Sequence, residues 1–377
     1  MEISYNAPAH TGLPFVQTQA AYYPPSGKTV CFVKDEPTGV LMGVVTGLDQ
    51  IGVPVVSSID MGSFWAWTVR YNASREKLLL LAVMEHGASP WHGRLVAAEI
   101  VVSGDTLSFG AVQSVSLGML IEPNAPGDFL ITPAGQIVVS FMSRHPWAGM
   151  AVVGAFTGGT LTVGTPVMFV SGETNGGLSA DTRPALVYDP ISGKVVIWYE
   201  TRWADAEFFR VGQISGNSIS FGAAAEINTG YKVRRSEMCL RDGKVVALVR
   251  GQWGFAYSVG TISGQSIAFS DPFALDWGDA ETWPSPTFTH HLRHDPSSGY
   301  LCIIDNGYAA IFHPDTLEND VADIAELVDV TDVAHDQQNS RFSVALAGQV
   351  SWVSLTGGAV VVAVFWTNFH GQTEQIE

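Results

Sequence analysis

An internal repeat of about 54 residues is the feature that most constrains this chain. The clearest copy runs from Tyr188 to Gly222 and holds a Pro-Ile-Ser-Gly-Lys turn, an apolar strand-like run, a polar connection, a second such run and a Ser-Ile-Ser-Phe-Gly segment. The later segment recurs as Thr106–Gly110, Thr160–Gly164 and Ser266–Phe269. The turn recurs with variations at seven positions, which are Gly27, Glu76, Gly135, Gly193, Gly243, Gly299 and Gly348.

Each copy is predicted to fold as four antiparallel strands, A to D, with tight turns between A and B and between C and D. Strand B is often apolar throughout, as in Leu78–Val83, Ile137–Phe141 and Val245–Val249, which is expected of a strand covered on both faces. Seven such units predict an all-β fold, a seven-bladed β-propeller of four-stranded antiparallel blades. We expect residues 1–377 to form this single domain.

The two ends of the chain bear on how the ring closes. The seventh unit offers only three strands, near Phe342–Leu346, Gln349–Ser354 and Ala359–Trp366. We expect the N-terminal segment Glu2–Tyr5 to supply the fourth and close the last blade, which would leave no open sheet edge. The alternative is six blades with a C-terminal appendage. The acidic segment Asn319–Gln338 fits either an outer strand and loop of the sixth blade or a short helix.

The composition excludes several classes of protein. The formal net charge is −17, and an acidic surface repels nucleic acid and anionic membranes. The longest apolar run, Ala359–Trp366, is far shorter than a membrane span, so we expect no membrane insertion. The first residues show no secretory signal, which predicts synthesis in the cytoplasm. Cys31, Cys239 and Cys302 lie in apolar strand-like runs, which predicts buried thiols rather than disulfides.

The predicted topology sorts the connections onto two faces. The A–B and C–D turns lie on one face, the turn face, and the B–C and D–A connections lie on the opposite loop face, where we expect long loops. The expected loop-face tryptophans are Trp91, Trp147, Trp203 and Trp253 in B–C connections and Trp65, Trp67, Trp277 and Trp283 in D–A connections. Aromatic side chains gathered on loops are typical of binding surfaces. The alternative is that these rings cap the ends of the blades.

Charged residues accompany these rings. The candidate ligand-binding set comprises Trp91, Trp147, Trp203, Trp253, Trp283, Arg144, Arg183, Arg202 and Arg250. Aromatic rings flanked by charged side chains suit sugars, whose C–H faces stack on rings while their hydroxyls need polar partners. The alternative for each arginine is an ion pair that braces a loop. The sequence has no phosphate-binding glycine loop, no Gly-x-Ser-x-Gly elbow and no zinc motif, so we expect no metal and no cofactor.

The Ser-Gly-x-Ser-Ile-Ser-Phe-Gly unit resembles propeller repeats of bacteriophage tail and adhesin proteins, from Gly27 to about Phe273. The resemblance implies a surface-recognition protein of the virion. Its expected partners are a host-surface carbohydrate or receptor and other tail proteins, and it leaves open a homo-oligomer. A structural scaffold domain within a larger assembly is a further alternative.

A second resemblance is to sialidase-like glycoside hydrolases. The stretch Leu240–Arg250 is similar to a strand pair of that family that ends in a carboxylate-binding arginine, and Arg250 matches that position. If the chain is an enzyme, this resemblance implies that Arg250 and Arg183 hold an anionic sugar and that Glu237 takes part in the chemistry. The family's aspartate-box turns are absent from this chain. We therefore expect a non-catalytic recognition propeller first and a hydrolase second.

Overall fold

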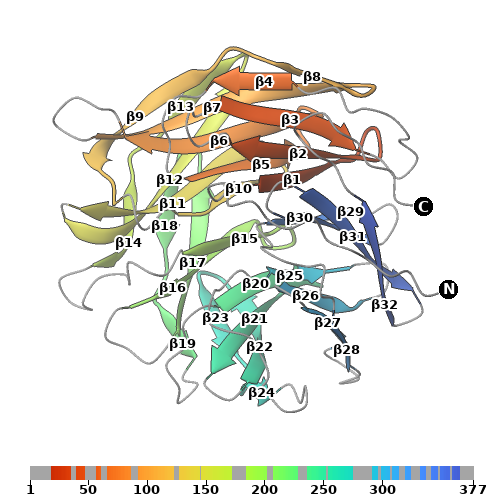
Figure 1. Ribbon diagram of the computed structural model, residues 1–377. Coiled ribbons are helices and arrows are strands. Elements are labelled where there is room, and N and C mark those ends of the chain that lie inside the picture. The colour runs from red at the N-terminus through yellow and green to blue at the C-terminus, as the bar shows by residue number, and fades with distance from the viewer. Residues whose placement is uncertain are drawn as a thin grey trace.

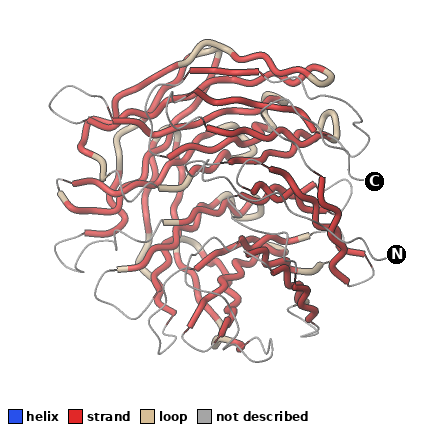
Figure 2. The backbone as a smooth tube through the Cα atoms, in the orientation of Figure 1, coloured by secondary structure: helices blue, strands red, loops and turns tan. Residues whose placement is uncertain are grey.

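The computed structural model shows an all-β molecule whose sheets are arranged around a centre (Figure 1). Figure 2 shows strands and connections and no helix in the part drawn in colour. None of the described residues belongs to a helix that could span a membrane. The structure describes residues 18–34, 40–46, 57–60, 66–85, 92–122, 127–144, 146–171, 184–201, 207–227, 236–251, 254–274, 291–295, 299–305, 308–313, 319–323, 332–336, 341–346, 349–356 and 359–365.

The described residues form seven antiparallel sheets that follow one another along the chain, each with a path of four strands paired in sequence order. The inner A strands are β1 (Thr18–Tyr23), β5 (Ala66–Asn72), β10 (Phe129–Ile131), β15 (Ala185–Asp189), β20 (Ser236–Arg241), β25 (His291–His294) and β29 (Asp332–Asp336). The B strands are β2 (Lys28–Lys34), β6 (Lys77–Glu85), β11 (Gln136–Arg144), β16 (Lys194–Glu200), β21 (Lys244–Gly251), β26 (Leu301–Asp305) and β30 (Arg341–Leu346).

The C strands are β3 (Val40–Thr46), β7 (His92–Ser103), β12 (Trp147–Thr157), β17 (Glu207–Ser215), β22 (Gly254–Ser263), β27 (Tyr308–Phe312) and β31 (Gln349–Thr356). The outer D strands are β4 (Ser57–Asp60), β8 (Thr106–Phe109), β13 (Thr160–Val163), β18 (Ser218–Phe221), β23 (Ser266–Phe269), β28 (Asn319–Asp323) and β32 (Ala359–Phe365). Each inner strand contacts the inner strand of the next sheet, and β29 contacts β1. The ring is therefore closed, and the fold is the expected seven-bladed β-propeller rather than six blades with an appendage.

The closure differs in detail from the expectation. The last sheet takes all four strands from the C-terminal part of the chain, because β29 is its inner strand. The expectation of a missing strand was therefore wrong, and Glu2–Tyr5 lies outside the described residues. The anchor at Gly348 was also misassigned, because residues 347–348 join β30 to β31 and not β29 to β30. The acidic segment Asn319–Gln338 contributes β28 to the sixth blade and β29 to the seventh.

The repeated turn is explained by its backbone conformation. Its first six predicted positions all have positive φ angles, namely Gly27, Glu76, Gly135, Gly193, Gly243 and Gly299. Between β20 and β21, Asp242 and Gly243 have φ of 50° and 73° and connect the directly paired residues Arg241 and Lys244. Two central residues with positive φ define the type I′ hairpin, which Asp-Gly favours. The glycine that recurs at this turn is therefore explained by the positive φ angle that the turn requires.

Four blades have an interrupted outer strand, which the sequence did not predict. Beyond β8, β13, β18 and β23 the chain pairs again with the same C strand, as β9 (Gln113–Leu120), β14 (Val167–Ser171), β19 (Ala225–Ile227) and β24 (Phe273–Ala274). At each interruption one backbone N–H still donates to the C strand, as Gly110 does to the Glu99 carbonyl at 2.8 Å and Gly222 to the Val211 carbonyl at 3.0 Å. The interruptions fall at equivalent places of the repeat, which are Phe109-Gly110, Val163-Gly164, Phe221-Gly222 and Phe269-Ser270.

The core consists of slabs between neighbouring blades. The β11 strand is buried along its whole interior because both of its faces are covered. The four strands β8, β13, β18 and β23 each bury one apolar side chain against the preceding blade; these are Leu107, Leu161, Ile219 and Ile267. The three cysteines are free and buried, as expected.

The turn face is braced by contacts from blade to blade. Tyr23 Oη donates to the Glu76 carbonyl at 3.0 Å, joining the A–B turns of the first two blades. Lys28 Nζ donates to the Gly104 carbonyl at 3.3 Å, and Gln136 Nε2 donates to the Gly216 carbonyl at 2.9 Å. Gly104 and Gly216 hold equivalent places in the C–D turns, so these contacts repeat with the blades. They place the A–B and C–D turns on one face, as predicted.

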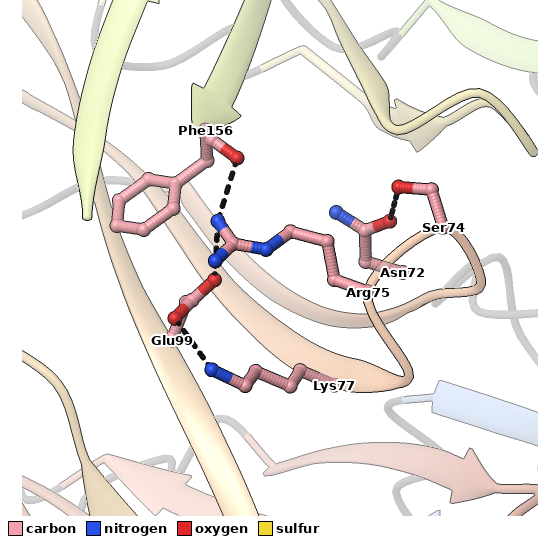
Figure 3. Close-up of polar contacts among 6 residues, drawn as sticks. All are labelled: Asn72, Ser74, Arg75, Lys77, Glu99 and Phe156. Carbon is pink, nitrogen blue, oxygen red and sulfur yellow. Dashed lines mark hydrogen bonds and ion pairs between the residues drawn. The ribbon is translucent and has the colours of Figure 1, made fainter. Parts of the chain in front are cut away.

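Figure 3 shows the bracing between the second and third blades. Arg75 Nη1 donates to the Phe156 carbonyl of β12 at 3.0 Å and lies 2.7 Å from Glu99 Oε1. Lys77 Nζ lies 3.0 Å from the other oxygen of Glu99. The Glu99 carboxylate thus pairs with two cationic side chains, and one of them, Arg75, also reaches the next blade.

Candidate functional site

The described part of the loop face presents an exposed tryptophan at the tip of the β11–β12 hairpin. Trp147 is 47% exposed, and among the described residues Phe273 is the other exposed large aromatic side chain, also at 47%. It pairs directly with Arg144 across the hairpin, whose connection is only residues 145–146. The Gly135 turn lies at the other end of β11, so Trp147 belongs to the face opposite the turns. This placement agrees with the prediction that Trp147 lies on the loop face.

A buried carboxylate fixes the arginine of this hairpin. Glu122 Oε2 accepts a hydrogen bond from Arg144 Nε at 2.8 Å. The Glu122 side chain is 7% exposed and that of Arg144 is 35% exposed. Hydrogen bonds between two charged groups are stronger than neutral ones, and the more so where one partner is shielded from water. The pair therefore holds the arginine side chain in one orientation at the base of the loop face.

The backbone around the pair is also held. The Glu122 N–H donates to the Met142 carbonyl at 2.9 Å, and Ile121 forms a bridge with Ser143. The Ser143 hydroxyl donates to the Ala148 carbonyl at 3.3 Å and also contacts the Pro146 carbonyl. The connection from the second blade is thus fastened to the second strand of the third. Directly opposed residues on paired strands have Cβ atoms about 5 Å apart, so Arg144 and Trp147 are neighbours on a rigid support.

We name Glu122, Arg144 and Trp147 the blade-three subsite. The sequence predicted Arg144 and Trp147 for ligand binding but missed Glu122. Glu122 lies two residues after the end of β9, in the segment Ile121-Glu122-Pro123, and a carboxylate at the start of a D–A connection is the only local signal of its role. Its burial arises from contact with the next blade, which no local pattern reveals.

Of the other seven predicted ligand-binding residues, the described part of the chain includes only Arg250. The remaining six lie outside it; these are Trp91, Trp203, Trp253, Trp283, Arg183 and Arg202. The backbone of Arg250 belongs to β21 and pairs with Phe255 near the loop-face end of that hairpin. Trp67 was expected in a connection but lies in β5 and is buried between the first two blades. Trp198 lies in β16 and is 1% exposed.

The loop-face connections are also less uniform than expected. In four blades the B–C connection is short, comprising only residues 145–146, 252–253, 306–307 and 347–348. The expectation that all B–C connections are long was therefore wrong, because polar and aromatic residues near hairpin tips continue the strand ladder. Trp147 is such a residue, since it is the first residue of β12. Its support is a strand and not a loop.

Glu237, named for the hydrolase alternative, lies on the inner strand β20. Its Oε2 is 3.8 Å from Arg293 Nη1 on β25. Arg293 also donates from Nε to the Val333 carbonyl of β29 at 2.9 Å. Backbone groups on the free edge of a strand need partners, and this arginine supplies one. Glu237 thus takes part in a contact that joins the fifth, sixth and seventh blades near the centre of the ring.

Asp128 makes a similar connection between the third and fourth blades. Its Oδ2 accepts the Leu186 N–H at 2.8 Å, and its Oδ1 accepts the Phe129 N–H at 2.7 Å. Burial raises the pKa of Asp128 above its usual value, although Arg70 and the two backbone donors act in the opposite direction. The described residues contain no group of three or more His, Cys, Asp or Glu side chains placed to hold a metal ion.

Comparison with known proteins identifies the fold and no family. No protein-family model matches the chain, and no curated protein matches it. Among solved structures it is similar to a candidate 6-phosphogluconolactonase from Bacteroides fragilis, with a TM-score of 0.54 and 14% identity over 94% of this chain and 95% of that one. It is similar to a protein from Lactobacillus plantarum, with a TM-score of 0.55 and 12% identity over 93% and 95% of the two chains.

A third similar structure is the β-propeller domain of Cps50 (Swd1) from Myceliophteria thermophila. The TM-score is 0.53 and the identity 8%, over 92% of this chain and 99% of that domain. These proteins have unrelated names, and one propeller architecture hosts many functions. The likeness therefore supports the propeller fold alone.

Proposed function

We propose that this protein is a non-catalytic recognition propeller that binds a host-surface glycan through its loop face, as a component of a bacteriophage tail. The observation that carries the proposal is the exposed Trp147 on a short hairpin beside an arginine fixed by a buried carboxylate. A large aromatic ring exposed to water is a feature of binding surfaces, where it supplies contact area at little cost in conformational entropy. The tail assignment is supported by the resemblance of the Ser-Gly and Phe-Gly repeat.

A sugar is the ligand that best suits this combination. The C–H face of a pyranose packs on an aromatic ring, and its hydroxyls need donors and acceptors in fixed places. The blade-three subsite supplies the ring from Trp147 and a polar group from Arg144, which Glu122 holds in place. Strands support sites more firmly than loops do, and all but one of these residues lie in strands. Glu237, the proposed acid or base of the hydrolase alternative, is engaged with Arg293, which supports binding without turnover.

The test compares exposed apolar residues on the two faces. Trp147→Ala is expected to weaken adsorption of the full chain to host cells by about tenfold, the loss of about 1.4 kcal/mol. Ile191→Ala is the matched control, because Ile191 is 76% exposed and lies in an A–B turn. We expect this variant to bind like the wild type. Thermal unfolding of both variants should match that of the wild type to within a few degrees.

Two results would contradict the proposal. If Trp147→Ala binds normally while Ile191→Ala loses binding, the working surface is the turn face. If Trp147→Ala loses binding only together with a large fall in the melting temperature, the ring is a blade cap. In the second case the exposed tryptophan is structural, which is the alternative that the sequence left open.

A further inference from the structure

We infer that the blade-three subsite accepts an uncharged sugar and discriminates against anionic ones. The inference rests on the proposed function and goes beyond it, because it names the chemical class of the ligand. It also differs from the hydrolase alternative, in which Arg250 and Arg183 hold an anionic sugar. The inference depends on Glu122, which the sequence did not single out.

The local electrostatics of the subsite support this inference. Arg144 Nε lies 2.8 Å from Glu122 Oε2, so the positive charge of the guanidinium is balanced within the protein. The Glu122 side chain is only 7% exposed and its backbone N–H is bonded to the Met142 carbonyl at 2.9 Å. The carboxylate therefore cannot simply move away when a ligand arrives. An anion approaching Arg144 would meet a fixed negative charge beside it, and like charges brought together at an interface are unfavourable.

The charge of the whole protein acts in the same direction. The formal net charge is −17, and such a field lowers the local concentration of anions near the surface. A single arginine that is already paired does not reverse this field. Specificity commonly combines a favourable contact with a repulsive element against the wrong ligand. At this subsite the aromatic ring of Trp147 supplies the favourable contact, and the charge of Glu122 supplies the repulsive element.

An uncharged sugar meets neither obstacle. Its ring packs on an indole without a charge to compensate. Its hydroxyls accept hydrogen bonds without bringing a charge, so they suit the part-exposed Arg144, whose charge Glu122 already balances. The support is held by strand pairing between Arg144 and Trp147 and by the Ser143 hydroxyl bonded to the Ala148 carbonyl. A subsite fixed before binding loses little conformational entropy when the ligand arrives.

The test uses the full chain on an array of neutral and anionic glycans, the latter bearing uronic acid, sialic acid or sulfate. We expect the wild type to bind neutral glycans and Trp147→Ala to lose that binding. If the glycans that depend on Trp147 are anionic, the inference is wrong while the proposed function stands. If no glycan is bound in a manner that depends on Trp147, the proposed function fails, and the inference fails with it.

A charge variant tests the role of Glu122 directly. Glu122→Gln keeps the size of the side chain and removes its charge, so anionic glycans should bind about tenfold more tightly than to the wild type. The double variant Glu122→Gln with Arg144→Gln is the matched control, because it restores neutrality, and it should show no such gain. An unchanged preference in Glu122→Gln, with unfolding like that of the wild type, would overturn the inference. If Glu122→Gln does not fold, the wild-type array still decides.

Discussion

The glycines at the interrupted outer strands offer a sharp test of how neighbouring blades fit together. A Cβ atom added to Gly222 would lie 1.8 Å from the backbone carbonyl oxygen of Gln265 in the next blade. A Cβ atom added to the equivalent Gly110 would lie 3.5 Å from its nearest atom, the Glu99 carbonyl oxygen, which is an ordinary contact. The two positions share their place in the repeat and differ in how closely another blade approaches. We therefore expect Gly222→Ala and Gly110→Ala to have opposite effects.

The size of the effect follows from the geometry. In Gly222→Ala the two blades must separate locally, since no side chain can yield in place of a backbone carbonyl. Overpacking of this kind costs about 1–3 kcal/mol. Gln265 Nε2 also donates to the Ser220 carbonyl and hydroxyl, both at 3.0 Å, and weakening these bonds adds about 1 kcal/mol. In Gly110→Ala the loss of flexibility in the unfolded chain stabilises the protein by about 0.4–1 kcal/mol.

The assay is thermal and denaturant unfolding of both variants beside the wild type. We expect Gly222→Ala to lower the melting temperature by several degrees and Gly110→Ala to leave it unchanged or raise it slightly. Gly164→Ala should behave like Gly222→Ala, because its Cβ would lie 1.8 Å from the Asn217 carbonyl oxygen. Equal stability of Gly222→Ala and Gly110→Ala would refute the close approach between the outer strands.

Three further predictions concern titration, thiol reactivity and turnover. Burial raises the pKa of Asp128, so as the pH falls this carboxylate is protonated in the folded protein before it is protonated in the unfolded chain. The free energy of unfolding of the wild type should therefore rise relative to that of Asp128→Asn as the pH falls from 7 to about 4. If urea titrations instead show that the free energy of unfolding of the wild type falls relative to that of Asp128→Asn, the arginines and backbone donors lower the pKa of Asp128 by more than burial raises it. Burial raises the pKa of Cys239 to about 12 and also raises that of Cys302, so neither thiol should react with a chromogenic disulfide reagent at pH 8 until the protein is unfolded; rapid reaction of the native protein would contradict their burial. Sialoside and glycoside reporters should not be hydrolysed, and steady hydrolysis that disappears in a normally folded Glu237→Gln would establish the hydrolase alternative.

The sequence predicted the ring because its turns have a local steric cause. Positive φ at positions such as Gly135 and Gly193 restricts the residue type, so the signal survives in every blade where such a turn occurs. The seventh blade was misassigned by one strand because Gly348 resembles this signal although it follows β30, while the connection after β29 contains no glycine. A connection without glycine leaves no comparable mark in the sequence.

The candidate site was predicted only in part, for a different reason. Arg144 and Trp147 are on one hairpin, so their proximity follows from local pairing. Glu122 reaches Arg144 through a connection that crosses from the second blade to the third. Contacts between blades depend on the packing of whole sheets, which local sequence patterns do not specify. The same holds for the approach of Gln265 to Gly222.

Hydrogen–deuterium exchange of the full chain, with and without a glycan that it binds, tests most directly which face does the binding. We expect the glycan to slow exchange at the tip of the β11–β12 hairpin, in the segment Arg144–Ala148, and to leave the turns at Gly104 and Gly216 unchanged. The bound glycan should be recovered intact. Protection of the turns without any change at the hairpin tip would contradict recognition through the loop face.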